Sequence, residues 1–446
     1  MSDVSLDTIA NLAKRRGFIF QASEIYGGLA GFWDYGPYGV ELANNLKKQW
    51  WRAMVYEHRN IFGIDGAIIQ NPKLWEASGH VAGFADPMVE DTVNHKRYRA
   101  DHLAGVDTNN LEELTELLKD KKSPDGNPLS EPRVFNMMMK TWVGAVEDDT
   151  SVAYLRPETA GPMYTNYENV RETTRSKIPF GIAQIGKAFR NEISPRDFIF
   201  RVRELEQMEM QYFIQPDKQD AEYQRWRDWV WNFCAEYIGL AEENLQWHEH
   251  ADDERAHYAK AAHDIYFKFP QGFKELSGTH NRTDFDLRNH IEASGRDLTY
   301  FDEVSREKYI PNVIESTIGV GRLFIAVLTQ AYTDEEVNGE IRTVLKIKPD
   351  LAPVKVAVLP LSKKPELNAL AEQVYTQLVK ATDWNIEYDE TQSIGKRYRR
   401  QDEIGTPYCV TIDFDSLEDN SVTIRERDSM QQVRVPIASI LDHIKI

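Results

Sequence analysis

The segment with the most chemical information is FRNEISPRDFIFRVRELEQME, residues 189–209. Arg190 and Glu192 lie at its start, a turn signal follows at Ser194-Pro195, and apolar residues then alternate with charged ones. This spacing predicts a strand, a loop and a returning strand with charged side chains on one face. An Arg on a strand can neutralise a phosphate, and a nearby Glu can accept hydrogen bonds from amines. An exposed hairpin with cross-strand ion pairs explains the pattern equally well.

The surrounding chain contains elements that could position these groups. Leu42, Leu46, Trp50 and Met54 recur at four-residue intervals and predict an amphipathic helix over 38–57. Residues 66–70 read as a short strand, and residues 226–240 read as a second amphipathic helix. The segment 108–132 is polar and then rich in Pro, Gly and Ser, so we expect a surface insertion there.

The pattern changes after the stretch KPDLAP at 348–353. Strands are predicted over 354–359, 384–388, 409–413 and 422–425, and helices over 366–381 and 437–444. Such alternation is typical of a small α/β layer fold. We therefore expect a larger domain over 1–350 and a smaller one over 351–446.

Length and composition set further bounds. A chain of 446 residues with 41% hydrophobic content is expected to form two or three packed domains. No apolar run is long enough for a transmembrane helix, and the N-terminus has no apolar signal core, so we expect no membrane association and a cytoplasmic location. Cys234 and Cys409 are the only cysteines, which argues against a disulfide framework and against a cysteine-based zinc site.

The charge distribution bears on possible partners. The formal net charge is -18, which disfavours nonspecific binding of duplex nucleic acid. A local exception is a basic run beside Tyr398, formed by Lys396, Arg397, Arg399 and Arg400. The run could be a solvated helix face, or it could contact the phosphates or bases of an RNA.

Four further segments carry a resemblance to a known family. They are LRPETAGPMY (155–164), PFGIAQIGKAFRNE (179–192), HNRTDFDL (280–287) and VIESTIGVGR (313–322). In this order they resemble homodimeric glycyl-tRNA synthetases, and residues 189–209 resemble the second signature of all class II aminoacyl-tRNA synthetases. The run SIGKRYRRQDEIGTPYCVTID (393–413) is similar to the anticodon-binding domain of the same enzymes.

The resemblance implies an α+β fold. A class II catalytic domain with an antiparallel sheet flanked by helices would occupy 1–350, with the insertion near 108–132. An α/β anticodon-binding domain would occupy 351–446. The implied activity is ATP-dependent attachment of glycine to tRNA(Gly) through a glycyl-adenylate, carried out by a cytoplasmic homodimer.

The first step of that reaction brings a carboxylate to the α-phosphate of ATP, so it requires cationic groups at the phosphates. By resemblance, Arg190 meets the α-phosphate and Arg322 the γ-phosphate, and the catalytic set is Arg190, Glu192 and Arg322. Glu275 and Glu315 match the acidic pair that holds Mg²⁺. No zinc is expected, because residues 89–99 lack the cysteine pair of many bacterial members. The implied ATP-binding residues are Arg190, Asn191, Glu192, Phe200, Arg201, Leu205, Glu275, Leu276, Gly319, Gly321 and Arg322.

Glycine has no side chain to recognise, so larger amino acids must be rejected by steric exclusion. Its ammonium requires carboxylates and its carboxylate requires an Arg. By resemblance, Glu158 and Glu315 bind the ammonium and Arg282 lies on the carboxylate side. The full implied substrate-binding set is Arg99, Glu158, Glu206, Glu209, Arg282, Glu315 and Thr317. His280 and His290, which flank NRTDFDLRN, are expected to be structural hydrogen-bonding residues.

The sequence departs from the family pattern at several places. Leu205 stands where the family has a Phe that stacks on adenine, and RPETA is not followed by the usual Gln. Thr317 stands where the family typically has Ser. Two alternatives are a noncatalytic, nucleic-acid-binding relative of synthetases and a class II synthetase for another amino acid. The retained arginines and carboxylates disfavour the first, and RPET with NRTDFD and VIEST disfavours the second.

Overall fold

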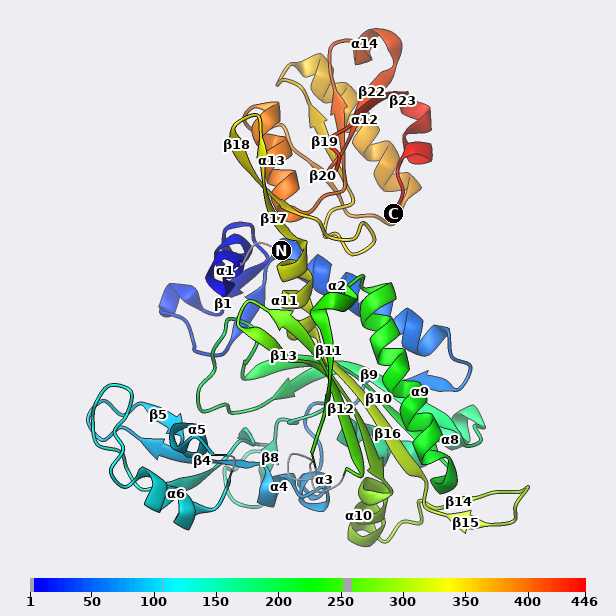
Figure 1. Ribbon diagram of the computed structural model, residues 1–446. Coiled ribbons are helices and arrows are strands. Elements are labelled where there is room, and N and C mark those ends of the chain that lie inside the picture. The colour runs from blue at the N-terminus through cyan, green and yellow to red at the C-terminus, as the bar shows by residue number, and fades with distance from the viewer. Residues whose placement is uncertain (1–3, 107, 252–258) are drawn as a thin grey trace.

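A seven-stranded sheet forms the centre of the larger, N-terminal part of the molecule (Figure 1). The computed structural model describes residues 4–106, 108–251 and 259–446. Neighbouring strands of the sheet are antiparallel, except that β3 and β9 are parallel. The strand order is β11 (Leu245–Glu249), β12 (Ala261–Phe269), β13 (Gly272–Thr283), β16 (Asn312–Gly319), β10 (Glu204–Ile214), β9 (Phe180–Phe189) and β3 (Ile61–Gly63).

The two faces of this sheet differ in chemistry. Along β10, Met208, Met210 and Tyr212 enter the main hydrophobic core, whereas the alternate residues Glu209 and Gln211 lie on the opposite face. The core face is covered by α2 (Pro37–Trp51), α9 (Gln219–Asn232) and α11 (Val320–Ala331). The polar face is covered at one end by α7 (Ala160–Thr165), α8 (Tyr167–Thr174) and α10 (Phe285–Ser294).

The predicted helices of this part are confirmed, but both begin and end earlier in the chain than predicted. The helix expected over 38–57 is α2 followed by a π-helical turn, Arg52–Tyr56. The helix expected over 226–240 begins earlier, as α9, and also ends in a π-helical turn, Phe233–Tyr237. Among the described residues, no helix is both long enough and apolar enough to cross a membrane.

The strand predicted over 66–70 is wrong, because only Ile69 forms an isolated bridge, to Leu155. Side chains satisfy the backbone here in place of a neighbouring strand. The Gly66 amide donates to Gln184 Oε1 at 2.6 Å, and its carbonyl accepts from Arg156 Nη1 at 2.7 Å.

The returning strand after Arg190 starts at Glu204, later than the alternation at Phe200 suggested. Asp197 and Phe198 adopt positive φ angles of 60° and 59° and form a turn. The amide of Arg203 donates to the carbonyl of Gly31 at 2.8 Å. These local bonds keep the segment outside the sheet and turn it toward the cavity described below.

A small satellite unit projects from the main sheet (Figure 1). Its sheet consists of β5 (Arg97–Arg99), β4 (Ala85–Glu90) and β6 (Arg133–Asn136), and its helices are α5 (Ala100–Ala104) and α6 (Leu111–Leu118). Val89, Ala100, Leu114 and Leu118 form its own buried cluster. The polar segment 108–132 is therefore one side of a packed unit.

The C-terminal part is an α/β layer, as the alternating pattern predicted (Figure 1). Its sheet has the order β20 (Ile386–Tyr388), β19 (Val356–Pro360), β21 (Tyr408–Ile412), β22 (Ser421–Glu426) and β23 (Gln432–Pro436). The helix predicted over 366–381 is α12 (Pro365–Ala381), and the basic run lies on α13 (Ile394–Ile404). The helix expected over 437–444 is a 3-10 helix, Ile437–His443.

Polar contacts fix the connection between the two parts. Glu403 on α13 accepts from Arg16 Nε at 2.5 Å, and Asn45 on α2 donates to the carbonyls of Leu351 and Ala352 at 3.1 Å. Lys355 Nζ donates to the carbonyls of Pro349, Asp350 and Ala352 at 2.7–3.1 Å. The connecting stretch is thus held by defined bonds.

Candidate active site

A cavity of about 420 Å³ opens on the polar face of the central sheet. Arg190 and Arg322 line it together, although the strands that end at these residues are separated by β10. Every residue expected at the ATP and substrate sites lines this cavity except Asn191. The sheet therefore brings together residues from Arg99 to Arg322 in one hollow.

Glu315 lies at the centre of the acidic end. It is 4% exposed, and its oxygens accept from Gln211 Nε2 and Arg282 Nη1 at 2.8 Å and from His280 Nδ1 at 2.7 Å. Burial opposes ionisation, but the charges of Arg282 and His280 outweigh it and hold the pKa of Glu315 well below its usual range. Glu315 is therefore a buried, ionised carboxylate.

Glu209 and Glu158 complete the acidic end with different electrostatics. Burial, together with the charges of Glu315 and Glu158, raises the pKa of Glu209 to about 8. Its Oε2 accepts from the Thr159 hydroxyl and its Oε1 from Gln211 Nε2 at 2.8 Å. For Glu158, burial is outweighed by His80, whose Nε2 lies 3.4 Å away, and by Arg282, so its pKa is lowered.

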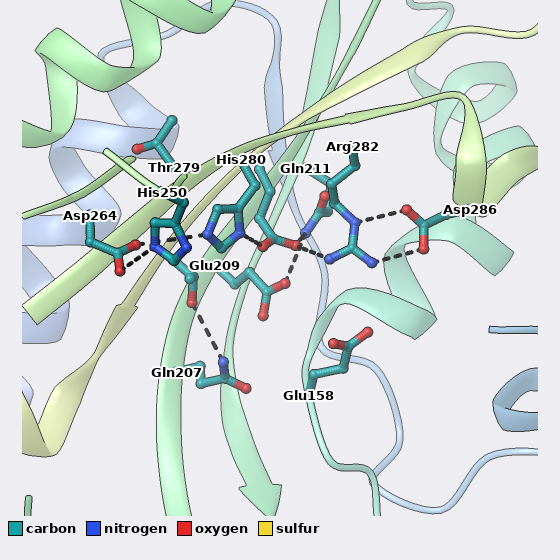
Figure 2. Close-up of polar contacts among 12 residues, drawn as sticks. Glu158, Gln207, Glu209, Gln211, His250, Asp264, Thr279, His280, Arg282 and Asp286 are labelled. Atoms are coloured by element: carbon teal, nitrogen blue, oxygen red, sulfur yellow. Dashed lines mark hydrogen bonds and ion pairs between the residues drawn. The ribbon is translucent and has the colours of Figure 1, made fainter. Parts of the chain in front are cut away.

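Arg282 is held rigidly beside these carboxylates (Figure 2). Its Nε and Nη2 donate to Asp286 at 2.8 and 2.9 Å, and Nη1 donates to Glu315. The side chain is 3% exposed and lines the cavity. The expected direct contact with a substrate carboxylate would have to share a guanidinium that Asp286 and Glu315 already engage.

The middle of the cavity floor is formed by Thr317 and Gln207. Thr317 lies opposite Glu209 in the ladder between β16 and β10, and Gln207 Nε2 lies 3.5 Å from its hydroxyl oxygen. This part of the cavity is therefore polar, and one of its buried hydrogen-bond acceptors, Gln207 Oε1, has no partner among the described residues.

The other end of the cavity is cationic and less buried. Arg190 Nε donates to the Pro157 carbonyl at 3.1 Å, and its guanidinium lies 5.6 Å from the Phe84 ring centroid. Arg322 pairs with Glu275 at 2.8 Å and lies 4.6 Å from the centroid of Phe200. Gly319 precedes α11, and a Cβ there would meet only Arg322 Cγ at 4.0 Å, whereas a Cβ at Gly321 would lie 3.1 Å from the carbonyl oxygen of Ile199.

The satellite unit contributes one wall. Arg99 of β5 lines the cavity and pairs with Asp86 at 3.0 Å and with Asp101 at 2.5 Å. A substrate would have to compete with both carboxylates for the guanidinium of Arg99. Arg201 also lines the cavity, and its backbone forms an isolated antiparallel bridge with Arg196.

Two of the expected residues have contacts that bear on their roles. Glu206 lines the cavity but pairs with Lys47 of α2 at 3.1 Å, because its position in β10 alternates with that of Glu209. Asn191 follows the end of β9, where its amide donates to the Met137 carbonyl at 2.9 Å, and it does not line the cavity.

Of the two expected magnesium ligands, Glu315 fits less well. It is 4% exposed and accepts from Arg282, His280 and Gln211, which leaves little room for the several waters that Mg²⁺ keeps. Glu275 fits better, since its side chain is 48% exposed at the cationic end. Within the described ranges, no group of three or more His, Cys, Asp and Glu residues is arranged to hold a metal ion.

The basic run on α13 divides into structural and accessible residues. Arg397 is 1% exposed and donates to the carbonyls of Pro360 and Gln392, so its expected role as an RNA contact is wrong. Arg400 pairs with Asp389. Lys396 is exposed, and Arg399 is partly exposed at 3.8 Å from Glu340.

Sequence reasoning missed the full role of His280. It was expected to be a structural hydrogen-bonding residue, and it does bond Glu315, but it also lines the cavity. His280 lies directly opposite Glu315 in the ladder between β13 and β16. Only the strand register, which the motifs do not specify, could have placed it there.

Comparisons with known proteins agree with this fold. Residues 145–331 match the family described as the tRNA synthetase class II core domain (G, H, P, S and T), and residues 355–445 match the anticodon binding domain family. The antiparallel sheet, the paired arginines and the C-terminal α/β layer thus define a class II aminoacyl-tRNA synthetase.

Curated relatives narrow the class. The glycine–tRNA ligase of Treponema denticola is 50% identical over 99% of this chain and 97% of its own length. Those of Caldanaerobacter subterraneus and Streptomyces coelicolor are 50% and 49% identical, over 98% and 99% of this chain and 97% and 98% of their own lengths. The chain belongs to the glycine–tRNA ligase family.

Proposed function

We propose that this protein attaches glycine to tRNA(Gly) in an ATP-dependent reaction through a glycyl-adenylate. The observation that carries the proposal is the single cavity, with two arginines at one end and three carboxylates at the other. The reaction needs both ends within reach of one another, because the glycine carboxylate must attack the α-phosphate. Membership of the glycine–tRNA ligase family supports the same activity.

The acidic end suits the glycine ammonium. Glu158, Glu209 and Glu315 all line the cavity, and their oxygens can accept hydrogen bonds from the three N–H groups of an ammonium. Arg282, fixed by Asp286, would supply positive charge for the substrate carboxylate. Thr317 and Gln207, which line the cavity side by side, are the groups proposed to exclude a methyl group on the α-carbon and so to reject alanine.

The cationic end suits the triphosphate. Arg190 and Arg322 would take the α- and γ-phosphates, with Glu192 as the third catalytic group. The remaining ATP contacts would come from Phe200, Arg201, Leu205, Leu276, Gly319 and Gly321, which line the cavity. Glu275 would hold Mg²⁺, which neutralises phosphate charge when bound.

The second step requires tRNA. We assign the domains as 1–350 for catalysis and 351–446 for anticodon binding, supported by the change from the mixed sheet to the α/β layer. On α13, Lys396 and Arg399 remain as candidate tRNA contacts. Lys396→Ala should raise the KM for tRNA without changing pyrophosphate exchange, which needs no tRNA. A homodimer in the cytoplasm is proposed from the family resemblance, and light scattering would measure the mass.

ATP–pyrophosphate exchange across the amino acids tests the activity. Exchange with glycine alone supports the proposal. Exchange with threonine, proline or histidine would contradict the glycine assignment. Absence of exchange at saturating ATP would favour the noncatalytic, nucleic-acid-binding alternative, which the paired arginines of the cavity argue against.

A further inference from the structure

A line of polar side chains extends from the acidic end of the cavity into the outer strands of the sheet (Figure 2). His280 Nδ1 lies 2.7 Å from Glu315 Oε1, and its Nε2 lies 3.8 Å from Asp264 Oδ1. Asp264 Oδ2 in turn lies 2.7 Å from His250 Nε2. One imidazole thus connects the cavity carboxylate with a second carboxylate on β12.

Strand register and a glycine create this connection. His280 of β13 is directly opposite Glu315 of β16, and Asp264 of β12 is opposite Gly278. A Cβ at Gly278 would lie 3.1 Å from the ring atoms Cε1 and Nε2 of His280 and 3.2 Å from Asp264 Oδ1. Gly278 therefore leaves open the space through which the ring faces Asp264.

The surroundings of His280 favour its cationic form. Burial alone would lower its pKa, but hydrogen bonds to Asp264 and Glu315 raise the pKa to about 10. Asp264 is 5% exposed, and the pKa-raising effect of its burial is outweighed by the two histidines, so its pKa is lowered. A fixed positive charge therefore lies against Glu315 on the side away from Arg282.

This charge matters because three carboxyl groups, those of Glu158, Glu209 and Glu315, line one end of the cavity. The guanidinium of Arg282 bonds both Glu315 and Asp286, so its single positive charge does not neutralise both carboxylates. A second cation allows Glu315 to remain ionised next to Glu158 and Glu209. An ionised, immobile carboxylate is the form that attracts an ammonium.

We propose that His280 and Asp264 are positioning residues of the glycine site, which act by holding Glu315 ionised and oriented toward the substrate ammonium. The inference rests on the proposed glycine activation. Glu315 makes the contact with the ammonium, His280 fixes Glu315, and Asp264 fixes His280. A purely structural role for the pair would instead affect folding and both substrates equally.

The test compares variants in pyrophosphate exchange. An Asn amide at 280 can replace the Nδ1 donor to Glu315 without its charge, whereas a Gln amide replaces the more distant Nε2 donor. His280→Gln should raise the KM for glycine roughly 10- to 100-fold, as expected for a lost charged hydrogen bond, while the KM for ATP changes less than about twofold. His280→Asn should recover part of the loss, and Asp264→Asn should give a smaller rise in the same KM.

His263→Gln is the matched control. His263 lies next to Asp264 on β12 and bonds the Tyr223 hydroxyl at 2.6 Å, so its loss should leave the KM for glycine unchanged. Calorimetric titration with a nonreactive glycyl-sulfamoyl adenosine measures affinity even in inactive variants, and circular dichroism reports folding.

Three outcomes would overturn the positioning role while exchange by the wild type still supports the proposed function. They are an unchanged KM for glycine in folded His280→Gln, equal rises in the two KM values, and equal affinities of His280→Gln and His263→Gln for the sulfamoyl compound. Failure of the wild type to exchange with glycine would instead contradict the proposed function itself.

Discussion

The two ends of the cavity are built in different ways. The acidic end consists of buried side chains on the central strands β10, β13 and β16, where Glu315, Arg282 and Asp286 are locked by mutual hydrogen bonds. At the cationic end, Arg190 follows β9 and Arg322 lies in the first turn of α11, and both are only partly buried. Arg322 pairs with the largely exposed Glu275.

The difference matches the two recognition problems. Glycine offers few atoms and must be distinguished from alanine by one methyl group, which requires walls that do not move. A triphosphate offers many oxygens and much charge, so adaptable cations can find it. Residues on the strands of the sheet therefore provide selectivity for glycine. Residues on the segments that follow the strands neutralise the charge of the triphosphate.

The largest expected effect comes from breaking the rigid end. Glu315→Gln leaves Arg282 and His280 partly uncompensated, and removing one partner of a buried ion pair costs about 3–5 kcal/mol of unfolding free energy. Glycine activation should be lost together with stability, measured by urea unfolding and pyrophosphate exchange. Glu206→Gln, which removes a partly exposed ion pair with Lys47, is the control, and a comparable loss of stability in that variant would contradict the distinction.

Breaking the cationic end should remove activity without unfolding the protein. Arg190→Ala deletes a phosphate contact and should lower the exchange rate by at least about 100- to 1,000-fold. Because Arg190 is partly exposed, its thermal unfolding should shift little. Near-normal exchange in this variant would remove the phosphate role, and a collapse of stability would remove the contrast with Glu315.

A pH experiment sharpens the comparison, because Glu209 has a pKa of about 8 and lies only at the acidic end. Since this folded pKa is above the ordinary value of 4.5, the folded state retains a proton that the unfolded state releases. Glu209 should therefore lower the free energy of unfolding by on the order of a few kcal/mol as pH rises from about 4.5 to 8. Glu209→Gln should flatten this decline in urea titrations, and an unaltered profile would contradict the raised pKa.

The smallest expected effect concerns the adaptable end. Leu205 lines the cavity without an aromatic face. Leu205→Phe should strengthen the stacking of adenine by about 0.5–1.5 kcal/mol, which corresponds to a roughly 2- to 10-fold lower KM for ATP. The KM for glycine should stay the same, and a change in it would indicate that the two ends are coupled.

Much of the site could be predicted from sequence because its residues belong to contiguous motifs. Arg190, Glu192 and Arg322 were assigned to the catalytic set and Arg282 and Glu315 to the substrate-binding set, and all five line one cavity. The α/β layer after residue 353 followed from its alternation of strands and helices. Local spacing was sufficient in these cases.

Sequence reasoning was less informative where a role depends on register or on partners from distant segments. Glu206 resembles Glu209 in sequence, but alternation along β10 sends its carboxylate to Lys47. Arg397 looks like its basic neighbours, yet α13 turns it inward to backbone carbonyls. The importance of His280 becomes visible only when β13 is aligned with β16.

The joint near Lys355 has a mechanical consequence. The Lys355 ammonium donates hydrogen bonds to three carbonyls of the connecting stretch. Asn45 of α2 donates to the carbonyls of two residues in the same stretch. Such a connection is expected to be rigid rather than flexible. A nucleic acid that contacts both domains must then match a separation that the protein fixes. A molecule of the wrong length would be rejected for its size, whatever its base sequence.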